Sequence, residues 1–155
     1  MSIKTVEFFS GIGGWSYSLA NLPGNFEVVE AFDINPIANQ VYKLNHKLTP
    51  NHKSIEHITS KQLGKLNAEM WVMSPPCQPH TRNNTTATRD DNDPRSNAFL
   101  KLMGLLQEMA PPPRYIALEV SIDVCLSLMT VTFPYDIYVR ILKLLLYKYA
   151  LCLIL

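Results

Sequence analysis

The chain has 155 residues, a length that suits one domain and leaves little room for a second. Hydrophobic residues make up 47% and charged residues 17%, so a packed core is feasible and wholesale disorder is disfavoured. The net charge of +1 argues against nucleic-acid affinity from bulk charge, although a local basic patch is compatible with it. The three cysteines, Cys77, Cys125 and Cys152, show no metal-type spacing. Without a signal peptide, a reducing compartment is expected, the cytoplasm or the nucleus.

The first expected strand, residues 5–9, runs into a glycine-rich turn at residues 10–14. A helical pattern begins directly afterwards at Trp15. A strand, a glycine turn and a helix in succession form the first half of a nucleotide-type binding unit. Glycine turns are also ordinary connectors, so this motif leaves ligand binding open.

A second strand is expected at residues 26–32, and it ends in Asp33. An acidic residue roughly 20 positions beyond a glycine turn is placed to bind the hydroxyls of a ribose. Alternatively, Asp33 or Asn35 caps the next helix, which Pro36 would begin. The two roles are compatible, and turn and acid together favour a cofactor that contains a nucleoside.

Two nucleotide-binding patterns are missing. The turn lacks the later glycine of the GxGxxG fingerprint, and no Walker lysine follows it. A phosphate-free nucleoside cofactor is therefore the better expectation, and S-adenosylmethionine fits.

The middle of the chain predicts a third short strand, or its exit loop, at residues 54–58. Ile55 could pack on an adenine and Glu56 could lie near the ribose, or both could be ordinary surface-loop residues. Residues 59–66 predict a short helix with Thr59 as its cap.

The nucleophile candidate follows the next strand, residues 68–72. Pro75 and Pro76 end the strand and stiffen a loop that presents Cys77 at the carboxyl end of the sheet. Such a thiol suits a nucleophile that must meet a substrate atom at a fixed angle. The alternative is a buried, inert thiol, for which a position between prolines is a poor one.

Downstream, residues 83–94 are polar and suit either a catalytic loop that closes over nucleic acid or a plain solvated loop. Ser96 is expected to cap a helix at residues 97–109 with one apolar face. Three prolines then precede a last strand at residues 115–119.

The glycine turn, Asp33 and the string SPPCQPHTR at residues 74–82 together resemble the cytosine-5 methyltransferase family. The resemblance covers residues 1 to about 119 and is strongest to the Dnmt2 (transfer RNA aspartate cytosine methyltransferase) branch, with further matches at Asp93, Arg95, Ser96 and Phe99. Members of that branch methylate a cytosine in a transfer RNA anticodon loop. The resemblance implies a Rossmann-like fold, S-adenosyl-L-methionine as cofactor, and transfer RNA or DNA as partner.

The resemblance also implies roles for single residues. The cofactor would be held by Ile12, Gly13, Gly14, Asp33, Ile55, Glu56 and Ser74. Cys77 would attack carbon 6 of the cytosine, and Glu119 would hold its ring nitrogen 3 and amino group. Gln78 and Arg82 are candidates for substrate contact.

The sequence departs from the family in two places. His80 stands where this branch commonly has phenylalanine, and Val120 follows Glu119 where the family has asparagine. Residues 120–155 form an apolar tail without family likeness, and we hypothesise that it is a translated intron. Charged residues interrupt the tail, so a membrane anchor is disfavoured.

The fold expected is α/β, a parallel sheet truncated to about five strands in the order 3-2-1-4-5, with helices on both faces. The last strand would be an open edge. The function expected is cytosine-5 methylation of nucleic acid, transfer RNA more than DNA, with weak or no turnover by the chain as written. The alternatives are a DNA methyltransferase and a catalytically inactive fragment that binds cofactor or nucleic acid.

Overall fold

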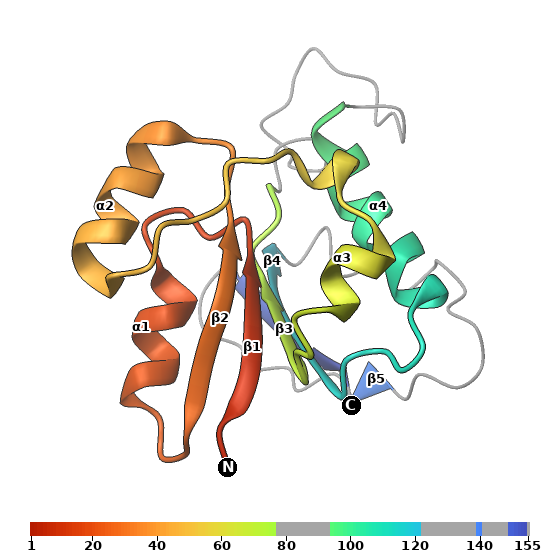
Figure 1. Cartoon of the computed structure of the whole chain (residues 1–155), viewed down its shortest axis with the longest axis horizontal. Helices are drawn as coiled ribbons and strands as arrows, with labels where there is room; N and C mark the ends of the chain where they lie inside the picture. The colour runs from red at the N-terminus through yellow and green to blue at the C-terminus, as the bar shows by residue number, and fades with distance from the viewer. Residues whose placement is uncertain (77–93, 122–138, 141–148, 155) are drawn as a thin grey trace.

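The computed structural model describes residues 1–76, 94–121, 139–140 and 149–154. Its sheet has the order β2-β1-β3-β4-β6-β5 (Figure 1). The strands are β1 (Ile3–Phe8), β2 (Phe26–Phe32), β3 (Met70–Met73), β4 (Tyr115–Ser121), β5 (Val139–Arg140) and β6 (Tyr149–Ile154). The first four pair in parallel, and β6 pairs antiparallel with both β4 and β5. The α/β, Rossmann-like fold is confirmed.

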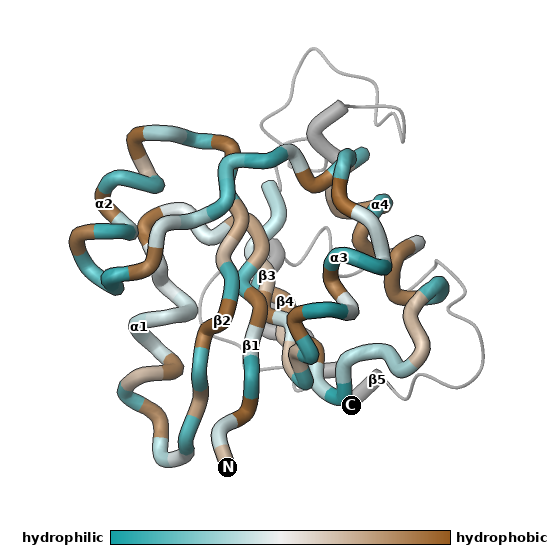
Figure 2. Tube along the Cα trace, viewed as in Figure 1, coloured by the Kyte–Doolittle hydropathy of each residue, from teal (hydrophilic) through white to brown (hydrophobic). Residues whose placement is uncertain are grey.

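Helices cover both faces of the sheet (Figure 1). On one face lie α1 (Gly14–Asn21) and α2 (Pro36–His46). On the other lie η1 (Ile55–His57), α3 (Ser60–Gly64) and α4 (Pro94–Glu108). In Figure 2 the helical tubes alternate between hydrophobic and hydrophilic residues, as helices with one buried side do.

The main core lies between the sheet and the helices η1, α3 and α4. Phe8 on β1 stacks on Phe32 at a ring-centroid distance of 5.4 Å and meets the edge of Trp71 at 5.0 Å. Neighbouring residues on each strand point to opposite faces, so Val72 and Ala117 pack instead with Leu19 of α1.

Sequence patterns place several element boundaries correctly. Asn35 caps α2 by accepting hydrogen bonds from the amides of Ile37 and Ala38, and Pro36 is its first residue, as expected. Thr59 caps α3 through a capping box with Gln62. Asp33 also stabilises the start of α2, because its Oδ1 accepts a hydrogen bond from the amide of Asn35 at 2.8 Å.

Residues 54–58 were expected to form a short strand or its exit loop, and the strand is wrong. These residues form the single turn η1, with the His57 amide bonded to the Ser54 carbonyl. Ile55 and Ile58 are both buried on one side, a spacing of three that suits a helical turn and not a strand. Only an isolated parallel bridge between Asn51 and Phe32 occupies the expected strand position within the described part of the chain.

Two further expectations are wrong. The expected start of α4 after Ser96 is wrong, because the helix already begins at Pro94, and proline is well tolerated in the first turn of a helix. The edge of β4 is not open, because β6 pairs along its length from Ser121↔Tyr149 to Ile116↔Ile154. This pairing also carries β4 two residues beyond Glu119, its expected end. In the described residues, no helix is both long and apolar enough to cross a bilayer.

Candidate cofactor and catalytic site

A cavity of about 460 Å³ opens at the carboxyl ends of β1, β2 and β3. Its volume falls within the roughly 300–1,000 Å³ typical of small-molecule sites. Ligands of open α/β sheets bind at this edge. The cavity is lined by Phe9, Phe32, Asp33, Ile34, Lys53, Ser54, Ile55, Glu56, Ser74, Pro76 and Ala98. Four residues expected to bind a cofactor, Asp33, Ile55, Glu56 and Ser74, are thus brought together from separate parts of the chain.

Asp33 connects the end of β2 to the glycine turn. Its Oδ2 accepts a hydrogen bond from the Gly11 amide at 2.7 Å, and its Oδ1 accepts from the Asn35 amide at 2.8 Å. Charge-assisted bonds of this kind are the stronger ones. Each carboxylate oxygen can accept a second hydrogen bond, so Asp33 can hold the turn and still bind a hydroxyl of a ligand.

Ser74 connects the cavity to Glu119 at the end of the neighbouring strand. The Trp15 indole Nε1–H donates to Ser74 Oγ at 2.9 Å, and the Ser74 hydroxyl donates to Glu119 Oε2 at 3.1 Å. The Ser74 amide also bonds to the Phe8 carbonyl at 3.4 Å, which keeps the residue close to the end of β1. The two residues expected in the cofactor pocket and in catalysis therefore share a hydrogen bond.

Several lining or linking residues were not expected from the sequence, and three of them bear on the geometry of the site. Ile34 follows Asp33 and leaves 71% of its surface exposed at the cavity. Phe9 lies at the exit of β1 with a φ of 55°, a strained value for a residue with a side chain. Trp15 donates to Ser74. Ile34 could have been found from its place after the acidic residue, whereas the strain at Phe9 has no signal in the sequence.

The glycine turn lies beside the cavity, with Gly11 bonded to its wall. Gly13 has a φ of 95°, and a Cβ there would lie 2.2 Å from His46 Nε2. This residue is therefore a glycine because of the turn itself and the close packing of α2. Ile12 is exposed, and Gly14 begins α1 in open space. Ile12, Gly13 and Gly14 are not among the cavity's described lining residues, and their contact with a cofactor stays a prediction.

The expected nucleophile Cys77 and the substrate candidates Gln78 and Arg82 lie outside the described residues. The loop that carries them follows Pro76, the last described residue of this segment, which lines the cavity. Their roles also stay predictions.

The lining chemistry fits S-adenosylmethionine. Phe32, Ile34 and Ile55 offer apolar surfaces of the kind that pack on a flat adenine. The carboxylates of Asp33 and Glu56 can accept hydrogen bonds from ribose hydroxyls or from amino groups. Within the described residues, no group of three or more His, Cys, Asp or Glu side chains could hold a metal ion.

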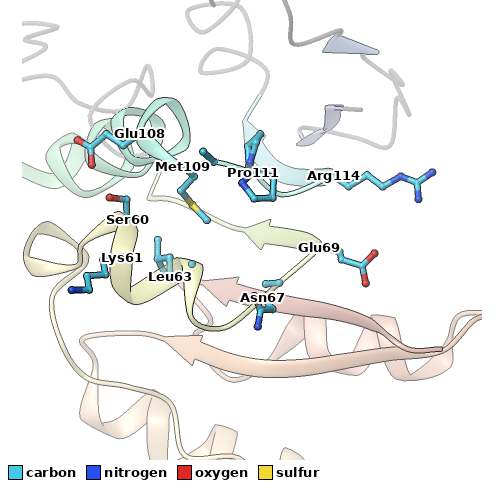
Figure 3. A pocket seen from close by; sticks show the side chains of 13 residues that line it. Ser60, Lys61, Leu63, Asn67, Glu69, Glu108, Met109, Pro111 and Arg114 are labelled. Carbon is cyan, nitrogen blue, oxygen red and sulfur yellow. The ribbon is translucent and has the colours of Figure 1, made fainter.

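A larger hollow of about 780 Å³ lies at the other end of the sheet, between α3 and the end of α4 (Figure 3). Its lining includes Lys61, Glu69, Glu108 and Arg114. Glu69 and Arg114 directly precede β3 and β4, so this hollow is at the amino ends of the strands. None of the expected site residues lines it. The smaller cavity is the functional site candidate, because it lies where parallel sheets bind ligands.

A family model described as C-5 cytosine-specific DNA methylase matches residues 3–120. The chain belongs to this family. Its expected membership, inferred from the turn, Asp33 and the cysteine loop, is confirmed, as is its likeness to the Dnmt2 branch.

Curated relatives in this family act on two kinds of nucleic acid, as their names state. The chain is 41% identical over 119 residues to a tRNA (cytosine(38)-C(5))-methyltransferase of Schizosaccharomyces pombe, a match that covers 76% of this chain and 35% of the relative. It is 41% identical over 117 residues to a DNA (cytosine-5)-methyltransferase of Dictyostelium discoideum, covering 76% of this chain and 30% of the relative. The matched part therefore spans about a third of each relative.

Solved structures of two methyltransferases share the fold. The S. pombe Dnmt2 methyltransferase superposes with a TM-score of 0.64 at 38% identity, over 79% of this chain and 35% of that one. The Entamoeba histolytica methyltransferase EhMeth superposes with a TM-score of 0.82 at 28% identity, over 99% of this chain and 53% of that one.

Proposed function

We propose that the cavity binds S-adenosyl-L-methionine and that the chain transfers its methyl group to carbon 5 of cytosine in nucleic acid, transfer RNA in preference to DNA. The observation that carries the proposal is the hydrogen bond between Ser74 in the cavity wall and Glu119. This bond supports the proposal, because it joins a residue of the cavity wall to the glutamate that is expected to act in catalysis. Membership of a cytosine-5 methyltransferase family supplies the reaction class.

In this proposal different residues of the cavity wall bind different parts of the cofactor. Ile34 and Ile55 pack on the adenine, and Asp33 and Glu56 accept hydrogen bonds from the ribose and the amino groups. Ser74 keeps Glu119 at the boundary between cofactor and substrate. The bound cofactor supplies an electrophilic methyl group on a sulfonium centre.

The chain's own residues activate the cytosine. Cys77, as a thiolate, forms a bond to carbon 6, and the ring electrons shift to carbon 5. Glu119 stabilises this change at nitrogen 3 and the amino group. After methylation, a base removes the carbon 5 proton, and the carbon–sulfur bond breaks to return the thiolate. A base inside a helix cannot reach such a site, so the target cytosine must leave its stack.

Transfer RNA is favoured because most of the curated relatives, the Schizosaccharomyces pombe protein among them, are named tRNA (cytosine(38)-C(5))-methyltransferase. DNA stays an alternative, since the Dictyostelium discoideum relative is named for DNA at the same identity. The third candidate is an inactive fragment that binds cofactor or nucleic acid.

Covalent trapping separates these candidates. The chain is incubated with S-adenosylmethionine and with a tRNA anticodon stem–loop or duplex DNA in which 5-fluorocytosine replaces the target. Fluorine at carbon 5 blocks the last proton loss, so an active enzyme stays bonded to its substrate. We expect a denaturant-resistant adduct with the RNA that is lost in Cys77→Ala and kept in the matched control Cys125→Ala. An adduct with DNA alone would support the alternative of a DNA methyltransferase, and cofactor binding without an adduct would support the inactive fragment.

A further inference from the structure

Glu7 is a fully buried acid directly beneath the glycine turn. It lies on β1, three residues before Ser10, and its side chain has no exposed surface. Burying an ionised carboxylate is costly unless it is paired with a cation or with several donors. The contacts of Glu7 therefore indicate whether its carboxyl group is ionised or protonated.

Three oxygen atoms meet at this point from three different elements. Glu7 Oε2 on β1 lies 2.5 Å from Ser16 Oγ on α1 and 2.9 Å from the Tyr42 hydroxyl on α2. The Ser16 and Tyr42 oxygens are also 2.5 Å from each other. All three contacts are at hydrogen-bond distance, so they form a closed triangle.

The number of protons decides the charge of this triangle. Serine and tyrosine bring one hydroxyl proton each, and an ionised carboxylate brings none. Two protons can fill only two of the three contacts, which leaves one pair of oxygens facing each other at close range without a proton. A protonated Glu7 supplies the third. Each oxygen can then donate once and accept once around the ring.

We propose that Glu7 is a positioning residue that carries its proton near neutral pH, and that this proton closes a ring of three hydrogen bonds with Ser16 and Tyr42. The ring ties β1, α1 and α2 together around the glycine turn. Gly13 packs directly against Tyr42 and His46, so the ring sets how closely α2 approaches the turn.

The surroundings of Glu7 agree with a neutral acid. Burial raises the pKa of Glu7, and this effect is larger than the opposing ones from Ser16, Tyr42, the Trp15 amide and the charge of His46. Burial also raises the pKa of Tyr42, so its hydroxyl keeps its proton. No described residue gives Glu7 Oε1 a well-formed hydrogen bond. An unpaired oxygen costs less on a neutral acid than on a carboxylate.

The direct test is carbon-13 NMR of the glutamate side-chain carboxyl carbons in the full chain, followed from acidic to alkaline pH. We expect the Glu7 signal, assigned through its backbone, to keep the chemical shift of a protonated acid through neutral pH. The exposed Glu27 on β2 provides the internal comparison, because its signal is recorded in the same spectra. A Glu7 signal with the carboxylate shift at neutral pH would overturn the proposal. This test needs no variant and no cofactor.

A second test uses the pH dependence of unfolding. A carboxyl whose pKa is raised on folding stabilises the protein fully below its unfolded pKa, and this contribution is lost as pH rises through the folded pKa. Glu30 also has a raised pKa, so the decisive quantity is the difference between wild type and Glu7→Gln. An amide is neutral at every pH and can donate as the acid does. We expect Glu7→Gln to fold and to lose the part of the pH dependence of its free energy of unfolding that Glu7 contributes. The control Glu27→Gln should keep that part. An unchanged slope in folded Glu7→Gln would contradict the proposal.

The ring also predicts an effect on the cofactor, a step that rests on the proposed function. Tyr42→Phe opens the ring and should weaken S-adenosylmethionine binding several-fold, with a smaller dependence on pH than in wild type. If the chain binds no cofactor while the NMR signal stays that of an acid, the proposed function fails and the ring stands.

Discussion

Ser74 Oγ lies 3.1 Å from Glu119 Oε2 and accepts the indole N–H of Trp15 at 2.9 Å. These three residues come from the start of α1, the loop after β3 and the end of β4. Indole can only donate, whereas a hydroxyl can both accept and donate. The Ser74 hydroxyl therefore accepts from Trp15 and donates to Glu119, which is held at the cavity by a residue of the cavity wall.

Replacing Ser74 with alanine should remove both bonds of this chain. The Trp15 N–H would lose its partner in a half-buried position, so we expect a loss of about 0.5–1.5 kcal/mol in the free energy of unfolding. Urea unfolding measures this directly. The matched control is Ser18→Ala, because Ser18 is exposed and donates only to the Gly14 carbonyl of its own helix. Equal losses in the two variants would contradict a linking role for Ser74.

The glycine turn offers a pair of neighbouring substitutions with opposite expected signs. Gly13→Ala places a Cβ at a φ of 95° and 2.2 Å from His46, so we expect it to destabilise the fold by roughly 1–3 kcal/mol. Gly14→Ala meets no atom within 4 Å and lies at the first position of α1. It should stabilise by about 0.4–1 kcal/mol through the unfolded state. Thermal unfolding that shifts both variants the same way would contradict this account of the turn.

Asp33 should affect both stability and cofactor binding. Asp33→Ala leaves the amides of Gly11 and Asn35 without their charged acceptor, and we expect a loss of about 1.5–3 kcal/mol in stability. Glu56→Ala removes an exposed carboxylate from the lining of the same cavity and should change stability by less than about 0.5 kcal/mol. Both should weaken S-adenosylmethionine binding. If Glu56→Ala destabilised the chain as much as Asp33→Ala, the structural role assigned to Asp33 would be wrong.

Local sequence patterns predict most of this fold, because each reports an interaction between near neighbours. The second strand was expected at residues 26–32 and occupies Phe26–Phe32, and Asn35 with Pro36 begins α2 as expected. The strand expected at residues 54–58 was wrong because its two isoleucines are three residues apart. This spacing fits a helical turn, but it is hard to recognise in a stretch of only five residues. The start of α4 was wrong because Ser96 was preferred over Pro94, although both are helix-start signals.

The pairing of β4 could not be predicted, because it depends on contacts between distant segments. Nothing in residues 115–119 identifies Tyr149–Ile154 as their neighbour. The site likewise combines features that local motifs predict with contacts between distant segments that they do not predict. Asp33 and Ser74 were expected at the cavity from their motifs, whereas the bond from Ser74 to Glu119 joins residues 45 positions apart. The ring around Glu7 likewise requires three elements to be placed before it becomes visible.

The most direct test of the account is calorimetric titration of S-adenosylmethionine into the full chain and into two variants, one substituted just before α2 and one within it. Ile34 and Ile37 are almost equally exposed, at 71% and 70%, but only Ile34 is among the cavity's lining residues. We predict saturable binding at one site, weakened about tenfold by Ile34→Ala through lost apolar contact of about 1.4 kcal/mol and unchanged by Ile37→Ala. No binding by the folded wild-type chain, or equal losses in the two variants, would contradict the assignment of this cavity to the cofactor.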